Sequence, residues 1–390
     1  MPETDSIDGR RVFRFDEIAT IVNDRVDDPS EANVDYYVGL EHLDSDSLTI
    51  RRWGSPSEVE ATKLRFRAGD IIFGRRRAYQ RKLGVAPFDG ICSAHAMVLR
   101  AKPHVVLPEF LPFFMQSDLF MERAREISVG SLSPTINWKT LAREKFALPS
   151  PEEQRRIARV LNATLNLTEA VSHQLVVVQS VLAALIVAFD ASVQGRMGRL
   201  SDIVTRLEAG SSPAGMGRPA SDEELGVLKV SAVGDWFFLA DENKVVAPDS
   251  FEHSLQVKAA DILATRANAD PESVGRTCIV EHCREGLMLS DKTWRLVIDP
   301  DCHIDPYAVL AWTKGPRFRA HVRNHLSGTD AKNISQAGFL SAPVPVGEVS
   351  AFNHFGTQVR ALLRAWLDTQ DRLETSRALA RAVWADTLNS

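Results

Sequence analysis

Residues 150–189 read SPEEQRRIARVLNATLNLTEAVSHQLVVVQSVLAALIVAF. The opening serine, proline and two glutamates supply a capping hydroxyl, a fixed φ and negative charge in the first turn, as helix starts usually do. From Ile157 to Phe189, ten positions are spaced alternately four and three residues apart, and eight of them are apolar. That spacing is typical of a coiled-coil seam. The stretch therefore predicts a long helix over residues 151–195.

A second series with the same spacing runs from Phe355 to Thr387, and seven of its ten positions are apolar. Each position lies 198 residues after its counterpart, as Phe355 does after Ile157. A buried helix in a large core explains either series alone, but two at equivalent places favour a pair of long helices, the second over residues 347–390. The polar seam residues Thr164, Thr168 and Thr369 are expected to set the register at some cost in stability.

The residues that precede the two helices resemble each other in the same order along the chain. Residues 69–78 (GDIIFGRRRA) match residues 260–269 (ADILATRANA), and residues 130–137 match residues 328–335. Alternating stretches such as residues 70–73 and 293–297 predict strands. Helical stretches are expected over residues 109–127 and 306–326. We therefore predict an α+β chain with an internal repeat: two similar globular domains, 1–150 and 196–346, each followed by a long helix.

Charge is distributed unevenly along this chain. The net charge is −5, so the protein as a whole is not a basic nucleic-acid binder. Between Lys63 and Lys102, however, ten lysines and arginines are opposed by only two aspartates. Segregated charge of this kind can build a positive patch on an acidic protein.

No motif in the sequence predicts catalysis or a metal site. The chain has no phosphate-binding loop, no Rossmann glycine turn, no Asn/Asp-Pro-Pro motif of amino-methyltransferases and no hydrolase or zinc-protease signature. The four cysteines lack zinc spacing, and reduced thiols are expected. The polar first residues do not form a signal peptide, and the apolar residues 175–189 are short for a membrane span. A cytoplasmic protein without metal or cofactor is expected.

The basic loop at residues 75–82 is the main candidate for contact with nucleic acid. It lies between two predicted strands, where basic side chains suit phosphates, while arginine and glutamine can also read base edges. A merely solvated loop is the alternative. The loop at 266–276 is less basic, and positive charge there is expected from Lys314, Arg317, Arg319, Arg323 and Lys332. The residues expected to contact DNA are Arg75, Arg76, Arg77, Tyr79, Gln80, Arg81, Lys82, Ser133, Thr135, Asn137, Arg266, Asn268, Lys332 and Asn333.

Five stretches together resemble the specificity subunits of type I restriction–modification systems. They are residues 69–75 (GDIIFGR), 88–93 (FDGICS), 98–100 (VLR), 130–137 and 148–157 (LPSPEEQRRI). The resemblance covers nearly the whole chain, in the order recognition domain, helix, recognition domain, helix. The second half departs from the pattern, because Ala260 replaces the usual glycine and residues 345–348 (PVGE) lack the glutamine of the first junction.

The resemblance implies that the two helices pack antiparallel as a spacer, with a pseudo-twofold repeat, and that each globular domain reads half of a split, asymmetric site in double-stranded DNA. Two methyltransferase subunits are expected to dock on the chain and to bring S-adenosylmethionine, and restriction–translocase subunits are further expected partners. Apolar helix residues outside the seam are predicted to face the methyltransferases: Val160, Val176, Val177, Val181 and Ile186. The alternatives are a protein–protein adaptor and a DNA-acting enzyme of unrecognised type.

Overall fold

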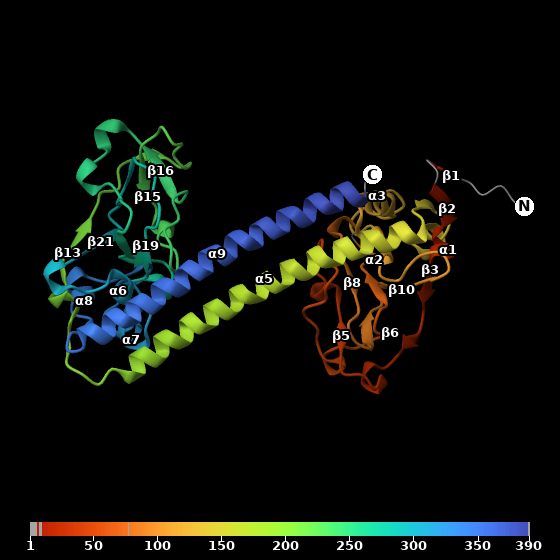
Figure 1. Ribbon diagram of the computed structural model, residues 1–390, viewed down its shortest axis with the longest axis horizontal. Coiled ribbons are helices and arrows are strands. Elements are labelled where there is room, and N and C mark those ends of the chain that lie inside the picture. The colour runs from red at the N-terminus through yellow and green to blue at the C-terminus, as the bar shows by residue number, and fades with distance from the viewer. Residues whose placement is uncertain (1–5, 8–9, 77, 389–390) are drawn as a thin grey trace, which may run out of the picture. The chain divides into compact units, whose positions relative to one another are not determined.

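The computed structural model describes residues 6–7, 10–76 and 78–388 (Figure 1). Arg77 of the basic loop therefore lies outside the described residues. The chain folds as two compact units. Unit 1 comprises Met1–Ser172 together with Arg372–Ser390, and unit 2 comprises His173–Asp371. Each unit has mixed α/β content.

The described residues of unit 1 form two four-stranded sheets and one three-stranded sheet. The first sheet is antiparallel, with the order β3 (Ala19–Val22), β10 (Met97–Ala101), β7 (Ile71–Phe73) and β8 (Leu83–Val85). The second has the order β4 (Arg25–Val26), β6 (Lys63–Phe66), β9 (Gly90–Ser93) and β5 (Tyr37–Val38). The third joins β1 (Ser6–Ile7), β2 (Arg10–Arg14) and β11 (Lys145–Leu148). The short helices are α1 (Phe15–Ile18), α2 (Leu111–Gln116), α3 (Asp118–Glu126) and α4 (Trp138–Leu141).

Alternation along β7 divides the core of unit 1 into two layers. Ile71 and Phe73 pack with α2, α3 and the first turns of the long helix, whereas Ile72 packs with residues of the second sheet. Successive side chains of a strand point to opposite faces, so a strand covered on both faces is apolar throughout. The predicted helical stretch 109–127 is two helices, because Ser117 ends α2 and caps α3 through the amide of Phe120.

Unit 2 has sheets with similar orders. An antiparallel sheet joins β13 (Val204–Ala209), β21 (Thr293–Ile298), β17 (Ile262–Thr265) and β19 (Thr277–Ile279). A second sheet joins β14 (Gly215–Met216), β16 (Asn243–Val246), β15 (Gly226–Leu228) and β20 (Leu287–Met288). Two-stranded sheets join β12 (Met197–Arg199) to β23 (Pro343–Pro345) and β18 (Ala267–Asn268) to β22 (Lys332–Asn333). The short helices are α6 (Pro306–Trp312), α7 (Pro316–Asn324) and α8 (Gln336–Leu340).

Two long helices, α5 (Pro151–Ser192) and α9 (Val349–Leu388), complete the chain (Figure 1). Helix α5 begins at the predicted proline, and the hydroxyl of Ser150 accepts a hydrogen bond from the amide of Glu153 at 3.2 Å. The buried side chain of Gln154 accepts from the amide of Leu107 at 2.8 Å and donates to the carbonyl of Pro149 at 2.9 Å. The junction glutamine therefore fixes the start of α5 to the body of unit 1.

Candidate nucleic-acid interface

Two loops of unit 1 are joined by main-chain hydrogen bonds at the end of β7. The amide of Ile136 donates to the carbonyl of Arg75 at 3.0 Å, and Arg76 pairs with Thr135 as an antiparallel bridge. Thr135 and Val129 exchange two hydrogen bonds of 3.0 and 3.1 Å. Gly130 allows the turn between them because its φ is +116°, which favours glycine. We call residues 75–76 and 129–136 the unit 1 clasp.

Several basic side chains of the loop after β7 form hydrogen bonds with other groups of unit 1. Arg81 bonds the carboxylate of Asp46 at 2.5 Å, that of Asp118 at 2.8 Å and the carbonyl of Gln116. Lys82 donates to the carbonyl of Leu40 at 2.7 Å. Arg75 donates to the carbonyl of Ala94 at 3.1 Å. These three residues hold the loop in place, so their predicted contact with DNA competes with structural hydrogen bonds.

Arg76, Tyr79 and Gln80 differ from these neighbours. Arg76 is exposed, Tyr79 is 54% exposed, and Gln80 is partly exposed on the 3-10 turn Ala78–Gln80. Burial lowers the pKa of nearby His95, and the positive charges of Arg76, Arg75 and Lys63 lower it further. The surface around Arg76 is therefore locally positive, as phosphate contact requires.

The other predicted residues of unit 1 lie on or beside the clasp and make local bonds. Ser133 accepts at its carbonyl from the hydroxyl of Thr135 at 3.1 Å. Asn137 caps α4 by accepting from the amide of Lys139 at 3.0 Å. Two exposed apolar residues of the same loop were not singled out from the sequence, Val129 and Leu132.

The equivalent place in unit 2 has the same main-chain bonds. The amide of Ile334 donates to the carbonyl of Arg266 at 3.1 Å, Ala267 pairs with Asn333, and Asn333 exchanges two 2.9 Å bonds with Ser327. Gly328 has a φ of +96°. We call residues 266–267 and 327–334 the unit 2 clasp. Its backbone pattern matches that of unit 1.

Of the predicted residues at the unit 2 clasp, Arg266 is exposed. The side-chain oxygen of Asn268 accepts from the amide of Asp270 at 3.0 Å, and that of Asn333 accepts from the hydroxyl of Ser327 at 2.9 Å. Lys332 donates to the carbonyl of Gly328 at 2.7 Å. The clasp thus brings Arg266, Asn268, Lys332 and Asn333 together across β18 and β22.

The other cations expected to give unit 2 its positive surface have partners within the unit. Arg319 donates to the carbonyls of Val274 and Glu272 at 3.0 and 2.7 Å, and Lys314 donates to the carbonyls of Asp235 and Thr277. The remaining two pair with carboxylates, Arg317 with Asp190 at 2.9 Å and Arg323 with Glu272 at 3.3 Å. The ion pairs offset the charge of Arg317 and Arg323, whereas bonds to neutral carbonyls leave the charge of Arg319 and Lys314 in place, so the expected positive surface stays a prediction.

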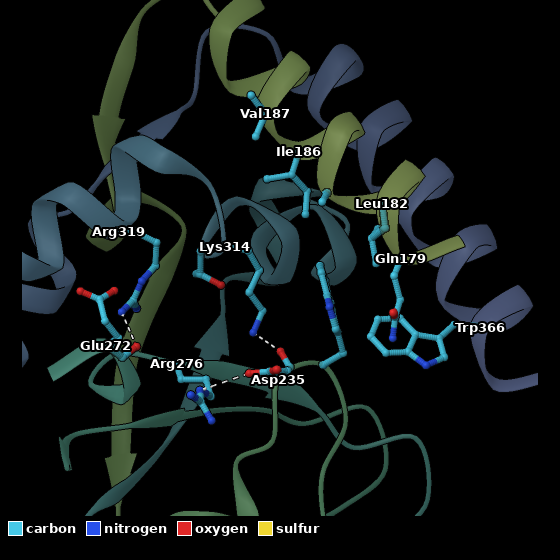
Figure 2. Close-up of a pocket in the computed structure, with 13 residues that line it drawn as sticks. Gln179, Leu182, Ile186, Val187, Asp235, Glu272, Arg276, Lys314, Arg319 and Trp366 are labelled. Carbon is cyan, nitrogen blue, oxygen red and sulfur yellow. Dashed lines mark hydrogen bonds and ion pairs between the residues drawn. The ribbon is translucent and has the colours of Figure 1, made fainter. Parts of the chain in front are cut away.

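Lys314 and Arg319 line a cavity of about 530 Å³ (Figure 2). The ammonium of Lys314 lies 5.1 Å from the ring centre of Trp236, and burial lowers its pKa to about 7. Arg276 pairs with Asp235 at 3.4 Å, while Ile186 and Val187 of α5 form another part of the lining. Two carboxylates and three cations share the lining, so the cavity is not a simple anion site.

The Asp of the repeated Gly/Ala-Asp-Ile motif has a structural role. Asp70 is buried and forms a bidentate ion pair with Arg100, at 2.7 and 2.8 Å. In unit 2, Asp261 pairs with Arg295 at 2.9 Å, and Arg295 also bonds Glu208 at 2.9 Å. Both aspartates also accept from the amide three residues before them, which closes the turn into the strand.

The predicted partner-facing residues of α5 divide into two groups. Val160, Val176, Val177 and Val181 are exposed, as are the unpredicted Leu167 and Val187. Ile186 is only 6% exposed and belongs to the main core of unit 2, so its assignment to a partner surface was wrong. The prediction from seam spacing took a second helix as the only neighbour of α5. In the structure, α5 also packs against the globular part of unit 2.

Among the described residues, no three His, Cys, Asp or Glu side chains gather to hold a metal ion. Burial raises the pKa of the Cys92 and Cys278 thiols to about 12, which makes them unreactive. Within the same residues one helix, α5, is long and apolar enough to cross a membrane, with a mean hydropathy of 2.1 in its most apolar window. In that window 17% of the helix is buried, and α5 contributes Ile157 and Leu182 to the two main cores.

Comparison with known proteins finds similarity to one family over part of the chain. Residues 12–178 match the model of the type I restriction modification DNA specificity domain. The specificity subunit of the type I restriction enzyme EcoEI from Escherichia coli is 32% identical over 160 residues, which are 40% of this chain and 27% of that protein. The chain thus spans about a quarter of that relative's length.

Two solved structures share the fold over nearly the whole chain. The S subunit of a type I restriction–modification system from M. genitalium has a TM-score of 0.62 at 11% identity, with 98% of this chain and 97% of that chain covered. A chain from a study of complex assembly and conformational transition of the type I R-M system has a TM-score of 0.51 at 21% identity, with 98% of each chain covered. At these identities the likeness shows the fold alone.

Proposed function

We propose that this chain is the non-catalytic subunit that reads DNA sequence for a type I restriction–modification system, because residues 12–178 match the model of the DNA specificity domain of such systems. It binds a split, asymmetric site and positions the subunits that modify or cut the DNA. The recognition domains are residues 1–150 and 196–346, and the spacer helices are residues 151–195 and 347–390.

The observation that carries this proposal is the repeated clasp. In both units, main-chain hydrogen bonds fix a loop beside a strand end that bears an exposed arginine, Arg76 in unit 1 and, one position earlier in the repeat, Arg266 in unit 2. The side chains around the two arginines differ. One backbone framework with two different surfaces is what a protein needs in order to read two different half-sites.

Contacts of α5 and α9 within each unit support an antiparallel spacer. In unit 1 the hydroxyls of Thr168 and Ser376 lie 2.6 Å apart, and in unit 2 the ring of Phe189 stacks on Phe355 with centres 4.1 Å apart. Moving 21 residues forward along α5, from Thr168 to Phe189, corresponds to moving 21 residues back along α9, from Ser376 to Phe355. Both contacts therefore fit a single antiparallel register. A polar pair within an apolar seam disfavours other registers.

Recognition is assigned to the exposed members of each clasp. Arg76, Tyr79 and Gln80 contact one half-site, and Arg266, Asn268, Lys332 and Asn333 contact the other. Arg75, Arg81 and Lys82 act mainly by positioning the first loop, because their side chains bond carbonyl and carboxylate groups within unit 1. Ser133, Thr135 and Asn137 shape the second loop of the unit 1 clasp.

The exposed apolar side chains of α5 are assigned to protein partners. Val160, Val176, Val177 and Val181 would be shielded from water by two methyltransferase subunits, which carry S-adenosylmethionine and methylate adenine. Restriction–translocase subunits are optional further members of this assembly, which we place in the cytoplasm. The chain itself binds no cofactor.

The test is the adenine-methylation pattern of host DNA with the gene present, deleted, or replaced by an Arg76→Ala, Arg266→Ala double variant. Loss of one split motif on deletion, and its loss or change in the double variant, supports the proposal. An unchanged pattern while the methyltransferase is expressed refutes it and favours a protein adaptor, whose duplex binding would not depend on Arg76. Turnover of DNA by the purified chain alone would favour an enzyme.

A further inference from the structure

The tip of the unit 1 clasp displays two apolar side chains to solvent. Leu132 is 93% exposed and Val129 is 76% exposed. Both lie on the loop whose Thr135 pairs with Arg76, so the main chain of this loop is joined to that of the exposed arginine. Single exposed apolar residues are common, but two on one short loop beside an exposed cation call for a physical explanation.

The loop that carries them is held in one conformation. Val129 is hydrogen bonded through its amide and its carbonyl to Thr135, and Gly130 makes the turn with a φ of +116°. The hydroxyl of Thr135 donates to the carbonyl of Ser133 at 3.1 Å. The side chains of Val129 and Leu132 are thus presented on an ordered backbone, and binding through them costs little further conformational entropy.

The unit 2 clasp shows that the fold does not need apolar residues here. Ser327 and Asp330 occupy the positions equivalent to Val129 and Leu132, on a backbone with the same hydrogen bonds. Because Leu132 is almost fully exposed, it adds no core burial to unit 1 either. The difference between the loops therefore concerns what they touch, not how they fold.

The chemistry of these side chains narrows what they can touch. Leucine and valine form no side-chain hydrogen bonds, so they gain only from contact with an apolar group. In the major groove, the apolar group on the edges of the four standard bases is the 5-methyl of thymine. We propose that Val129 and Leu132 are specificity-determining residues that contact the methyl group of a thymine in the half-site read by unit 1. This inference rests on the proposed function.

The experiment removes the methyl group without changing base pairing. Once the recognised site is known, the full chain with its methyltransferase partner is titrated with duplexes in which each thymine is replaced in turn by deoxyuridine. We expect one substitution, in one half-site, to weaken binding about fourfold, the ratio that corresponds to burial of one methyl group. A Val129→Ser, Leu132→Ser variant is expected to bind the thymine and uracil duplexes equally.

The matched control is Asp330→Ser in unit 2, which should keep the fourfold response to uracil. If the site is bound specifically but no uracil substitution has an effect, or if the variant keeps the response, the inference is wrong while the proposed function stands. Loss of the methyltransferase from the variant on co-purification would also overturn it, because the surface would then bind protein. Absence of any sequence-specific binding would instead refute the proposed function.

Discussion

At the unit 1 clasp, Arg76 pairs with a loop that carries Val129 and Leu132, whereas at the unit 2 clasp Arg266 bonds a loop that carries Asp330 and Lys332. The main-chain hydrogen bonds of the two clasps are the same, and each turn relies on a glycine with positive φ. Backbone bonds thus keep the geometry, and the side chains between them vary without cost to the fold. The two units can also be compared at the ion pairs of Asp70 and Asp261 and at the turns before β7 and β17. Each difference between the units at these places predicts a measurable effect.

The largest expected difference concerns the arginines that neutralise the motif aspartates. Arg295 bonds Asp261, Glu208 and the carbonyl of Gln256, while Arg100 bonds Asp70. We expect Arg295→Met to destabilise unit 2 by about 4 kcal/mol, because two partly buried carboxylates are left facing each other. Arg100→Met should cost unit 1 about 2–3 kcal/mol, since one buried carboxylate loses its partner.

Hydrogen exchange of peptides from β17 and β7 would measure the two losses separately. Burial already raises the pKa of Asp261, and removal of Arg295 should raise that pKa further. The loss in Arg295→Met should therefore shrink as the pH falls and the carboxyl is protonated. A larger loss in unit 1 than in unit 2 would contradict the comparison.

Lys314 gives unit 2 a pH response through a partly buried ammonium. Its pKa is about 7 in the folded protein against 10.5 for an ordinary lysine, so between these values the unfolded chain binds more protons. Stability should then rise with pH from 7 to 10, by about 2 kcal/mol after allowance for solvent screening. Urea denaturation across this range, compared with Lys314→Met, would measure it. If the Lys314→Met variant shows the same rise of stability with pH, other titratable groups cause that rise.

Arg76 and Arg266 are expected to act on different half-sites. Each alanine substitution should weaken binding of the complete site about tenfold, because a good contact between arginine and a base edge is worth on the order of 1–3 kcal/mol. Arg76→Ala should relax base preference in one half-site only, and Arg266→Ala in the other. Selection of bound sequences from a random library would show this. Relaxation of both half-sites by one substitution would argue against separate recognition.

The smallest expected effect comes from the turns before β7 and β17. Gly69 has a φ of +86°, and the equivalent Ala260 has a φ of +69°. A side chain in this left-handed region costs on the order of 1 kcal/mol. Gly69→Ala should destabilise unit 1 by about that amount, since a Cβ there meets no other atom within 4 Å. Ala260→Gly should stabilise unit 2 by slightly less than about 1 kcal/mol, because glycine also raises the conformational entropy of the unfolded chain. Thermal unfolding of both variants would test the two signs.

Local patterns in the sequence predicted local structure well. Helix α5 begins at Pro151 because the cap and first turn are encoded within four residues, and it ends at Ser192, three residues before the expected end. Helix α9 begins at Val349, two residues after the expected start. The strands β7 and β17 follow from short apolar runs.

The site was harder to predict, because the hydrogen-bond and ion-pair partners of its side chains lie far away in the sequence. Nothing near Arg81 indicated that Asp46 and Asp118 would bind it, and nothing near Lys314 indicated the carbonyl of Asp235. Ile186 was assigned to a partner surface because the helix seam predicts contact with α9 alone. In unit 2, α5 packs against both α9 and the globular core. The exposure of Leu132 could not be predicted, because an isolated leucine in a sequence can be either buried or exposed.

The use of main-chain bonds in the unit 1 clasp has a practical consequence for protein engineering. Because Val129, Ser131 and Leu132 are exposed and the loop is held by amides and carbonyls, these positions can be randomised together with Arg76 while Gly130 and Thr135 are kept. Four randomised positions give about 10⁵ protein variants, a number that a single library can cover. Such a library would search for new DNA preferences with few members lost to misfolding.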